Sequence, residues 1–229
     1  LKKKLHIPVI LFTYFNPILN FGLENFCELA SKALKSGTTS IKVIQLLESL
    51  KDKLHIPVIL FTYFNPILNF GLENFCELAS KVGVAGLIIP DLPLEEAYKF
   101  SEIISSYSID LILLVAPTTP SERMKIISNN TKGFTYLVSV TGVTGERNKM
   151  ENRVENLITK LQEISINPVA VGFGISSPEH VNKVRKWGVD GVIIGSAFVK
   201  RISNSNEIEV VNQIGDFCEE MRRAADQKI

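Results

Sequence analysis

The stretch Val169–Ala197, VAVGFGISSPEHVNKVRKWGVDGVIIGSA, contains the pattern that decides the fold. Its apolar run Val169–Val171 leads into a polar turn and then into a helix that begins at Pro178. That helix closes at Trp187-Gly188, and a second apolar run, Val192–Ile194, follows. Apolar runs without alternation are typical of strands buried on both faces, and a helix between two of them predicts that the strands are parallel.

The same strand-helix unit recurs along the chain from Leu54 onward. Local capping signals predict helices over Leu94–Ser106 and Ser121–Ser128. Further apolar runs predict strands at Val58–Phe61, Leu87–Ile89, Leu111–Val115 and Phe134–Val138. A repeating unit of roughly 25 to 30 residues suits a closed (βα)8 barrel and an open parallel sheet equally well.

Two features favour the barrel. No G-x-G-x-x-G motif follows a first strand, as a dinucleotide-binding open sheet would require. Polar residues and glycines also follow the carboxyl ends of many different strands, at Asn65-Pro66, Pro90-Asp91, Pro117-Thr118, Thr141–Gly145, Gly172–Ser176 and Gly195-Ser196. A barrel gathers all these ends on one face, where its active site lies. We therefore expect an α/β fold of the TIM (βα)8 type.

A repeat complicates this expectation, because Lys4–Lys32 recurs letter for letter as Lys53–Lys81. The first copy supplies a seventh strand at Val9–Phe12, but no strand follows before the helical stretch Thr39–Lys51. A (βα)8 barrel needs eight strands, so we expect an incomplete barrel in which strand 2 is missing. Residues 1–37 would form a duplicated strand-helix segment, and 38–229 the remainder of a single barrel domain. Identical copies compete for one position and leave strand edges unpaired, which predicts marginal stability or aggregation.

Composition excludes several classes of protein. A formal net charge of +1 gives no field that would attract nucleic acid or an anionic membrane. Cysteine and histidine occur at no metal-ligand spacing, so we expect no metal site and no disulfide framework. No apolar run approaches the roughly 18 residues that span a bilayer. The N-terminus at Leu1 shows no signal or transit segment, so we expect a soluble protein of the bacterial cytoplasm or of the stroma of a plastid that encodes the gene.

Two glycine-containing turns after the last two strands predict a phosphate-binding site. The turns Gly172–Ser176 and Gly195-Ser196 let the backbone approach an anion, and a helix N-terminus adds a favourable dipole. Ordinary tight turns are the alternative. The polar loop Ser139–Arg147 suits a lid that excludes water, or else is a plain surface loop.

Aromatic residues near the predicted strand ends have two possible roles. Tyr63, Tyr136 and Phe173 could line a pocket for an aromatic ligand or pack in the barrel core. We expect His180 to be a surface residue and Trp187 to serve packing.

Five segments together resemble one family, the tryptophan synthase alpha chain: Phe61–Ile67, FTYFNPI; Ile89–Glu96, IPDLPLEE; Gly133–Gly145, GFTYLVSVTGVTG; Val169–Ser176, VAVGFGIS; and Gly191–Ala197, GVIIGSA. The resemblance is ordered and nearly gapless from about Thr39 to Lys200. It implies a (βα)8 barrel that cleaves indole-3-glycerol phosphate to indole and glyceraldehyde 3-phosphate, in tryptophan biosynthesis and without a cofactor of its own. It also implies a beta-chain partner, a pyridoxal-phosphate enzyme, in an αββα complex.

The resemblance assigns roles to residues of this chain. Those around the substrate would be Tyr63, Tyr136, Thr144 and Phe173, with Thr144 steadying a catalytic carboxylate. The phosphate contacts would be Gly145, Gly174, Gly195 and Ser196. The loops that face the beta chain would include Asn65, Pro66, Asp91 and Pro93.

The family's catalytic carboxylates are not found in this sequence. Cleavage of the carbon-carbon bond needs an acid and a base, which the family takes from a Glu in a pattern like E-L-G-x-P and an Asp in a D-G-P segment. Neither pattern occurs, and the first-strand motif like P-Y-x-T-A-G-D-P is also missing. Glu24, Glu28 and Glu48 lie on helical stretches rather than at strand ends, so the catalytic residues stay unknown.

Three hypotheses follow for the function. The chain is a lyase by descent whose activity is lost, because each missing acid-base group commonly costs about 10² to 10⁴ in rate. Alternatively, it is a non-catalytic module that binds a phosphate ligand and the beta chain. A third hypothesis, another phosphate-binding barrel such as a sugar-phosphate epimerase, would want metal-ligand His and Asp at strand ends, and the chain has few His residues.

Overall fold

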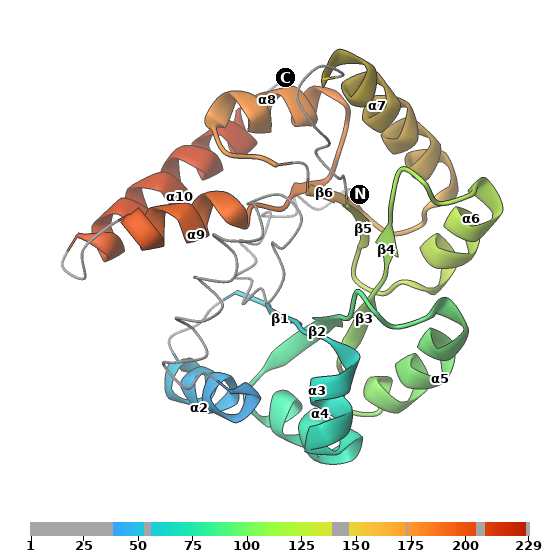
Figure 1. Ribbon diagram of the computed structural model, residues 1–229, viewed down its shortest axis with the longest axis vertical. Coiled ribbons are helices and arrows are strands. Elements are labelled where there is room, and N and C mark those ends of the chain that lie inside the picture. The colour runs from blue at the N-terminus through green and yellow to red at the C-terminus, as the bar shows by residue number, and fades with distance from the viewer. Residues whose placement is uncertain (1–38, 53–55, 139–146, 173, 205–208, 228–229) are drawn as a thin grey trace. The chain divides into compact units, whose positions relative to one another are not determined.

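A computed structural model describes residues 39–52, 56–138, 147–172, 174–204 and 209–227 (Figure 1). The predicted strand Val9–Phe12, the duplicated segment 1–37 and the loop 139–146 lie outside the described residues. The chain divides into two compact units, one ending at Leu113 and including 130–133, the other formed by 114–129 and by the residues from Phe134 onward. The prediction that 38–229 form one barrel domain stays a prediction.

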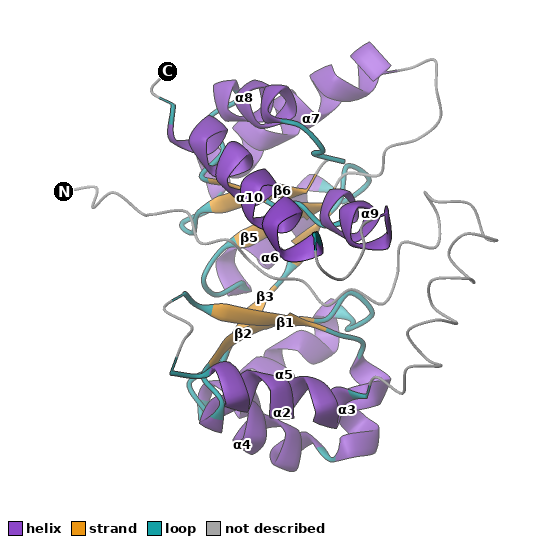
Figure 2. Cartoon of the chain, turned by 90° about the vertical axis from the view of Figure 1, so that its left-hand side faces the viewer, coloured by secondary structure: helices purple, strands orange, loops and turns teal. Residues whose placement is uncertain are grey.

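The first unit is a three-stranded parallel sheet covered by helices. Its strands are β1 (Val58–Phe61), β2 (Val84–Ile88) and β3 (Asp110–Ile112), in the order β1-β2-β3. Its helices are α2 (Ser40–Leu50), α3 (Phe64–Phe70), α4 (Leu72–Lys81) and α5 (Leu94–Ser105). Figures 1 and 2 show these helices on one face of the sheet.

The sequence predicted β1 and the helix α5 closely, but it predicted only the second half of β2. The strand begins at Val84, and its third residue, Gly86, stands opposite Ile59 and Asp110 in the neighbouring strands. A Cβ on Gly86 would lie 3.0 Å from Cδ1 of Ile112, so this position favours the residue without a side chain. Glycine weakens a strand signal in sequence, which explains the late predicted start at Leu87.

The prediction of a single strand over Leu111–Val115 is wrong, because the structure has two strands there, β3 and β4 (Leu114–Val115). The break falls at Leu113, whose N–H donates to the Oγ1 of Thr131 at 2.9 Å. Thr131 is itself buried. At Leu113, a side-chain hydroxyl accepts the backbone N–H in place of a carbonyl of a neighbouring strand. The strand pairing is therefore interrupted between β3 and β4.

The second unit contains a four-stranded parallel sheet in the order β4-β5-β6-β7. The further strands are β5 (Thr135–Val138), β6 (Val169–Gly172) and β7 (Gly191–Val192). The helices are α6 (Ser121–Asn130), α7 (Arg147–Ile164), α8 (Pro178–Lys186), α9 (Ser196–Asn204) and α10 (Val210–Asp226). Helix α10 packs against both α8 and α9 (Figure 1). The structure thus contains the parallel strands and intervening helices of the predicted α/β class.

The predicted helix after the glycine turn is confirmed as α8, together with its ends. Ser177 is the N-cap, and its hydroxyl accepts the N–H of His180 at 3.4 Å, while Pro178 follows as the first helical residue. Trp187 forms the C-cap, and Gly188 follows with φ of +85°. A left-handed residue at that place ends a helix, and glycine adopts it at least cost.

The core of each unit is mainly apolar. Ile67, Leu87 and Ile104 are fully buried in the first unit, and Leu137 and Leu161 are fully buried in the second. Among the residues that the structure describes, none of the helices combines the length and apolar character needed to cross a lipid bilayer.

Candidate functional site

The predicted site residues fall in both units, and each unit is considered by itself. Thr144, Gly145 and Phe173 lie outside the described residues. The second unit contains Tyr136, Gly174, Gly195 and Ser196, and the first unit contains the remaining predicted residues, Tyr63, Asn65, Pro66, Asp91 and Pro93.

The two glycine turns follow neighbouring parallel strands. Val171 in β6 stands opposite Val192 in β7, and the N–H of Ile193 donates to the carbonyl of Val171 at 2.8 Å. Because the strands run in the same direction, their carboxyl ends reach the same edge of the sheet. The turn Gly172–Ser176 and the turn Gly195-Ser196 therefore leave from adjacent positions.

The N-terminus of α9 is suited to an anion. The carbonyl of Gly195 accepts the N–H groups of Phe198 and Val199 at 2.9 and 3.2 Å, and the first turn of α9 carries no acidic residue. A Cβ on Gly195 would meet no atom within 4 Å, so packing does not require glycine here. The open space over this backbone leaves room for a ligand at the positive end of the helix dipole.

The N-terminus of α8 differs, because it already carries a carboxylate. Glu179 lies in the first turn of α8, and hydrogen bonds from the Ser177 hydroxyl and then from its own backbone N–H lower the pKa of its carboxyl. An anionic Glu179 opposes a second anion at this end of the helix. Of the two helix N-termini that follow the glycine turns, that of α9 is therefore the better place for a phosphate.

Tyr136 is packed over the glycine turn. It stands opposite Ala170 in the β5-β6 ladder and is half-buried. A Cβ on Gly172 would lie 2.7 Å from the Oη of Tyr136 and 2.9 Å from its ring carbon Cε2. The phenol thus crosses directly above Gly172, which brings a predicted substrate residue to the base of a predicted phosphate turn. No sequence spacing indicated this contact, since it joins positions on two strands.

The predicted partner-facing residues of the first unit lie on two loops that are bonded to each other. The Oδ1 of Asp91, after β2, accepts the N–H of Phe64 at 3.0 Å, at the start of α3. Asn65 and Pro66 occupy that exposed first turn. Pro93 is the N-cap of α5, and its carbonyl accepts two N–H groups at 3.0 Å.

Tyr63 and Phe64 complete this arrangement. Tyr63 immediately precedes α3 with an extended backbone, is half-buried, and makes no side-chain capping hydrogen bond. The ring of Phe64 meets that of Phe100 edge to face at 5.5 Å between centroids. Sequence reasoning missed Phe64, whose N–H and ring connect the loop after β1 to the loop after β2 and to α5.

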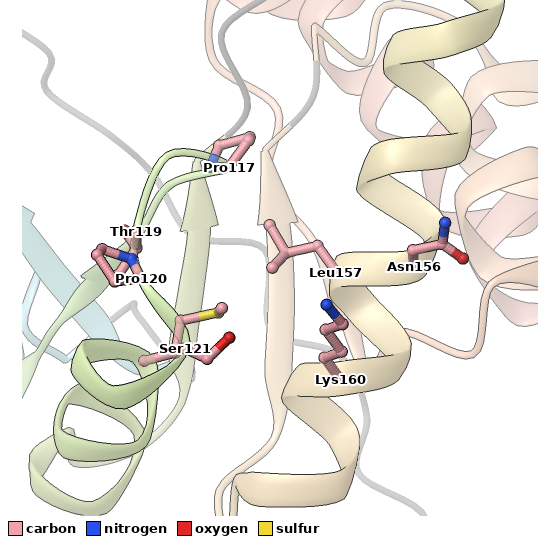
Figure 3. Close-up of a pocket in the computed structure, with 8 residues that line it drawn as sticks. Pro117, Thr119, Pro120, Ser121, Asn156, Leu157 and Lys160 are labelled. Atoms are coloured by element: carbon pink, nitrogen blue, oxygen red, sulfur yellow. The ribbon is translucent and has the colours of Figure 1, made fainter.

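A pocket of about 350 Å³ opens in the second unit between the start of α6 and α7 (Figure 3). Its lining combines prolines and hydroxyls at the start of α6 with side chains of α7: Pro117, Thr119, Pro120, Ser121, Met124, Asn156, Leu157 and Lys160. Of the predicted site residues that the structure describes, none is among these lining residues. The described parts of the turns after β6 and β7 therefore do not contribute to this pocket.

The ionisable groups that the structure describes offer no obvious nucleophile or metal site. Burial raises the pKa of the Cys76 thiol to about 11, so this cysteine stays protonated near neutral pH. Within the described residues, no group of three or more His, Cys, Asp or Glu could hold a metal ion. His180, expected at the surface, is half-buried, with its Nδ1 3.3 Å from the Oγ of Ser176. Glu48 lies on α2, as predicted.

Residues 28–226 match the family described as tryptophan synthase alpha chain. The chain belongs to this family. A tryptophan synthase alpha chain from Prochlorococcus marinus subsp. pastoris is 94% identical over 227 residues, which are 99% of this chain and 64% of that protein. One from Trichodesmium erythraeum is 49% identical over 221 residues, which are 96% of this chain and 65% of that protein. The chain thus spans about two thirds of the length of these curated relatives.

Solved structures agree with the family. A chain described with the tryptophan synthase α2β2 complex of Pyrococcus furiosus is 36% identical, with a TM-score of 0.81 over 93% of this chain and 85% of that one. A chain from Aquifex aeolicus is 32% identical, with a TM-score of 0.78 over 94% of this chain and 80% of that one. The α/β fold with parallel sheets described above therefore matches that of the tryptophan synthase alpha chain.

Proposed function

We propose that the protein to which this chain belongs is the alpha subunit of a tryptophan synthase, which cleaves indole-3-glycerol phosphate to indole and glyceraldehyde 3-phosphate. Family membership supports the reaction. The observation in this chain that carries the proposal is the pair of glycine turns at the adjoining ends of β6 and β7, with the N-terminus of α9 open above Gly195. The cyanobacterial relatives favour a bacterial cytoplasm over a plastid stroma.

The phosphate of the substrate would bind at Gly174, Gly195 and Ser196, and also at Gly145. Backbone N–H groups and the dipole of α9 supply the attraction without a side-chain cation. The indole and glycerol parts would lie against Tyr63, Tyr136, Thr144 and Phe173. The position of Tyr136 directly over Gly172 supports a ligand that contacts an aromatic ring and a phosphate turn together.

The partner would be a tryptophan synthase beta chain, bound in an αββα tetramer. The similar chain from Pyrococcus furiosus is described with such an α2β2 complex, which supports this partner. In the present chain the loops with Asn65, Pro66, Asp91 and Pro93 would face the partner, and the hydrogen bond from Phe64 to Asp91 would hold two of them in one arrangement. Pyridoxal phosphate would be bound by the beta chain, and this chain would need no cofactor of its own.

Within these 229 residues, the repeat would determine activity. We infer that the copy Lys4–Lys32 replaces the family's first two strands, because the patterns expected to carry the proton-transferring Glu and Asp do not occur in these 229 residues. Losing one such group commonly costs about 10² to 10⁴ in rate, and here both are lost. We therefore propose that these 229 residues bind a phosphate ligand and a beta chain but release indole at a negligible rate.

Calorimetric titration with glycerol 3-phosphate tests the phosphate site. Gly195→Ala places a methyl group in the open space over the backbone without touching protein, so it should weaken binding at least tenfold and leave the fold intact. Gly215→Ala is the matched control, because a Cβ there also meets nothing within 4 Å but lies on α10. Equal affinities of the two variants would refute the site.

Two further assays separate the lyase from the non-catalytic module. Indole release from indole-3-glycerol phosphate measures the first function directly. Stimulation of a beta chain that makes tryptophan from indole and serine measures the second. The expected result is stimulation of the beta chain without indole release. Indole release by the 229-residue chain would show instead that it is an active lyase.

A further inference from the structure

The segment that forms β1, α3 and α4 occurs twice in this chain. In the structure, residues 58–81 of the copy 53–81 form these three elements and hold their position in the fold, and residues 4–32 have the same sequence as 53–81. We propose that the chain has a second folded state in which residues 4–32 take this position and residues 53–81 are expelled. The chain would thus contain a built-in exchange between two copies of one strand-helix segment.

The contacts that the position makes with residues after Lys81 can be made by either copy. In β1, Ile59 and Leu60 stand opposite Gly86 and Leu87 of β2, and the N–H of Thr62 donates to the carbonyl of Ile88 at 3.0 Å. The partner residues all lie after Lys81, outside both copies. Ile10, Leu11 and Thr13 of the first copy match Ile59, Leu60 and Thr62 residue for residue.

The same holds for the helices of the position. Phe64 contacts Phe100 and donates its N–H to Asp91, and the hydroxyl of Ser80 donates to the carbonyl of Tyr107 at 2.8 Å. Phe15 and Ser31 are the matching residues of the first copy. The buried residues Ile67, Phe75, Cys76 and Ala79 likewise have identical counterparts in Ile18, Phe26, Cys27 and Ala30.

Chain connectivity distinguishes the two states. Residues 53–81 reach β2 through Val82 and Gly83, while residues 4–32 would reach it through a loop of 51 residues, 33–83. Closing the longer loop costs a factor of about 100 in population, from the length dependence of loop closure. The second copy also gains contacts that the first copy would lose, including the bond from the Lys51 ammonium to the Lys81 carbonyl at 2.7 Å. The state with residues 53–81 in place is therefore the major one.

The balance between the states can be reversed with core substitutions in one copy. Ile67→Ala with Phe75→Ala removes two buried side chains, and such losses weaken a core by a combined factor of about 10³ or more. This exceeds the loop penalty, so residues 4–32 should take the position. Ile18→Ala with Phe26→Ala is the matched control, because the same change in the first copy should leave residues 53–81 in place.

Thiol labelling measures which of the two copies lies in the folded position, because that copy's cysteine is buried. Cys76 is fully buried in the present state, and Cys27 is its counterpart. Trypsin releases the same peptide from both copies, so Glu24→Asp is added to every chain to give the first copy a distinct mass. In the parent chain Cys76 should react about 100-fold more slowly than Cys27, and in the Ile67→Ala, Phe75→Ala variant this order should reverse.

The proposal is overturned if both thiols react freely in that variant, because residues 4–32 would then have failed to replace residues 53–81. Urea unfolding supplies an independent check. Adding Ile18→Ala and Phe26→Ala to the variant should lower its unfolding midpoint further, since the replacing copy is then damaged too. An unchanged midpoint would show that residues 4–32 never take the position.

Discussion

The hydrogen bond between Asp91 and the start of α3 makes a sharp prediction for Asp91→Ala. The first N–H groups of a helix have no partner within it, and Tyr63 before α3 provides no side-chain cap. The carboxylate of Asp91 supplies one from the next loop, accepting the N–H of Phe64 at 3.0 Å. Helix α3 has 7 residues, so a single bonded N–H is a large part of its N-terminal turn.

The expected loss in unfolding free energy follows from the measured cost of removing helix caps. Replacing a capping oxygen by a methyl group commonly costs about 1 kcal/mol, and we expect that value for Asp91→Ala because the contact is solvent-exposed. Asp91→Asn keeps an acceptor oxygen and should cost only a few tenths of a kcal/mol. Glu102→Ala, which removes an exposed carboxylate from α5, is the control and should change stability by less than about 0.5 kcal/mol.

Equilibrium urea unfolding of the three variants measures these differences, and hydrogen exchange of the α3 amides localises them. Faster exchange confined to the first turn of α3 in Asp91→Ala is the expected pattern. The reasoning fails if Asp91→Ala is as stable as the parent chain. It also fails if Asn destabilises as much as Ala, because the charge and not the capping bond would then carry the effect.

Three other changes should have measurable effects. Gly172→Ala should cost about 1–3 kcal/mol and shift Tyr136, because the new methyl group would lie 2.7 Å from the phenol oxygen; unchanged near-ultraviolet circular dichroism and stability would contradict this. Gly215→Ala in the interior of α10 should stabilise the chain by about 0.5–1 kcal/mol in urea unfolding, and a loss would show an unrecognised contact. The Cys76 thiol has its pKa raised from 9.0 to about 11, so the folded state holds its proton more tightly and stability should fall as the pH rises from 9 to about 11. Cys76→Ala should reduce that fall, which unfolding at pH 8 and pH 11 would measure, whereas an equal fall in both chains would assign it to other groups.

Sequence signals correctly predicted the elements that depend on interactions between residues close in sequence. The apolar run of β1 and the Ser177-Pro178 start of α8 were predicted correctly because burial and capping depend on nearby residues. The break between β3 and β4 was missed because it depends on Thr131, 18 positions after Leu113. A tertiary hydrogen bond of this kind leaves no signature in the strand itself.

The candidate site shows the same division. The glycine turns after β6 and β7 could be predicted from sequence, since glycine has a local reason to occupy a turn. The contacts that organise the site could not: Asp91 meets Phe64 over 27 positions, and Tyr136 meets Gly172 across two strands. Each contact depends on sheet register, which follows from the packing of whole elements.

The crossing of Tyr136 over Gly172 constrains how the family can vary. A side chain at position 172 would lie against the phenol ring at position 136, so a change at one position alters the packing at the other. Relatives that replace the glycine should carry a small residue in place of the tyrosine, and relatives that keep the ring should keep the glycine. Aligned sequences of the family should therefore show the two positions changing together.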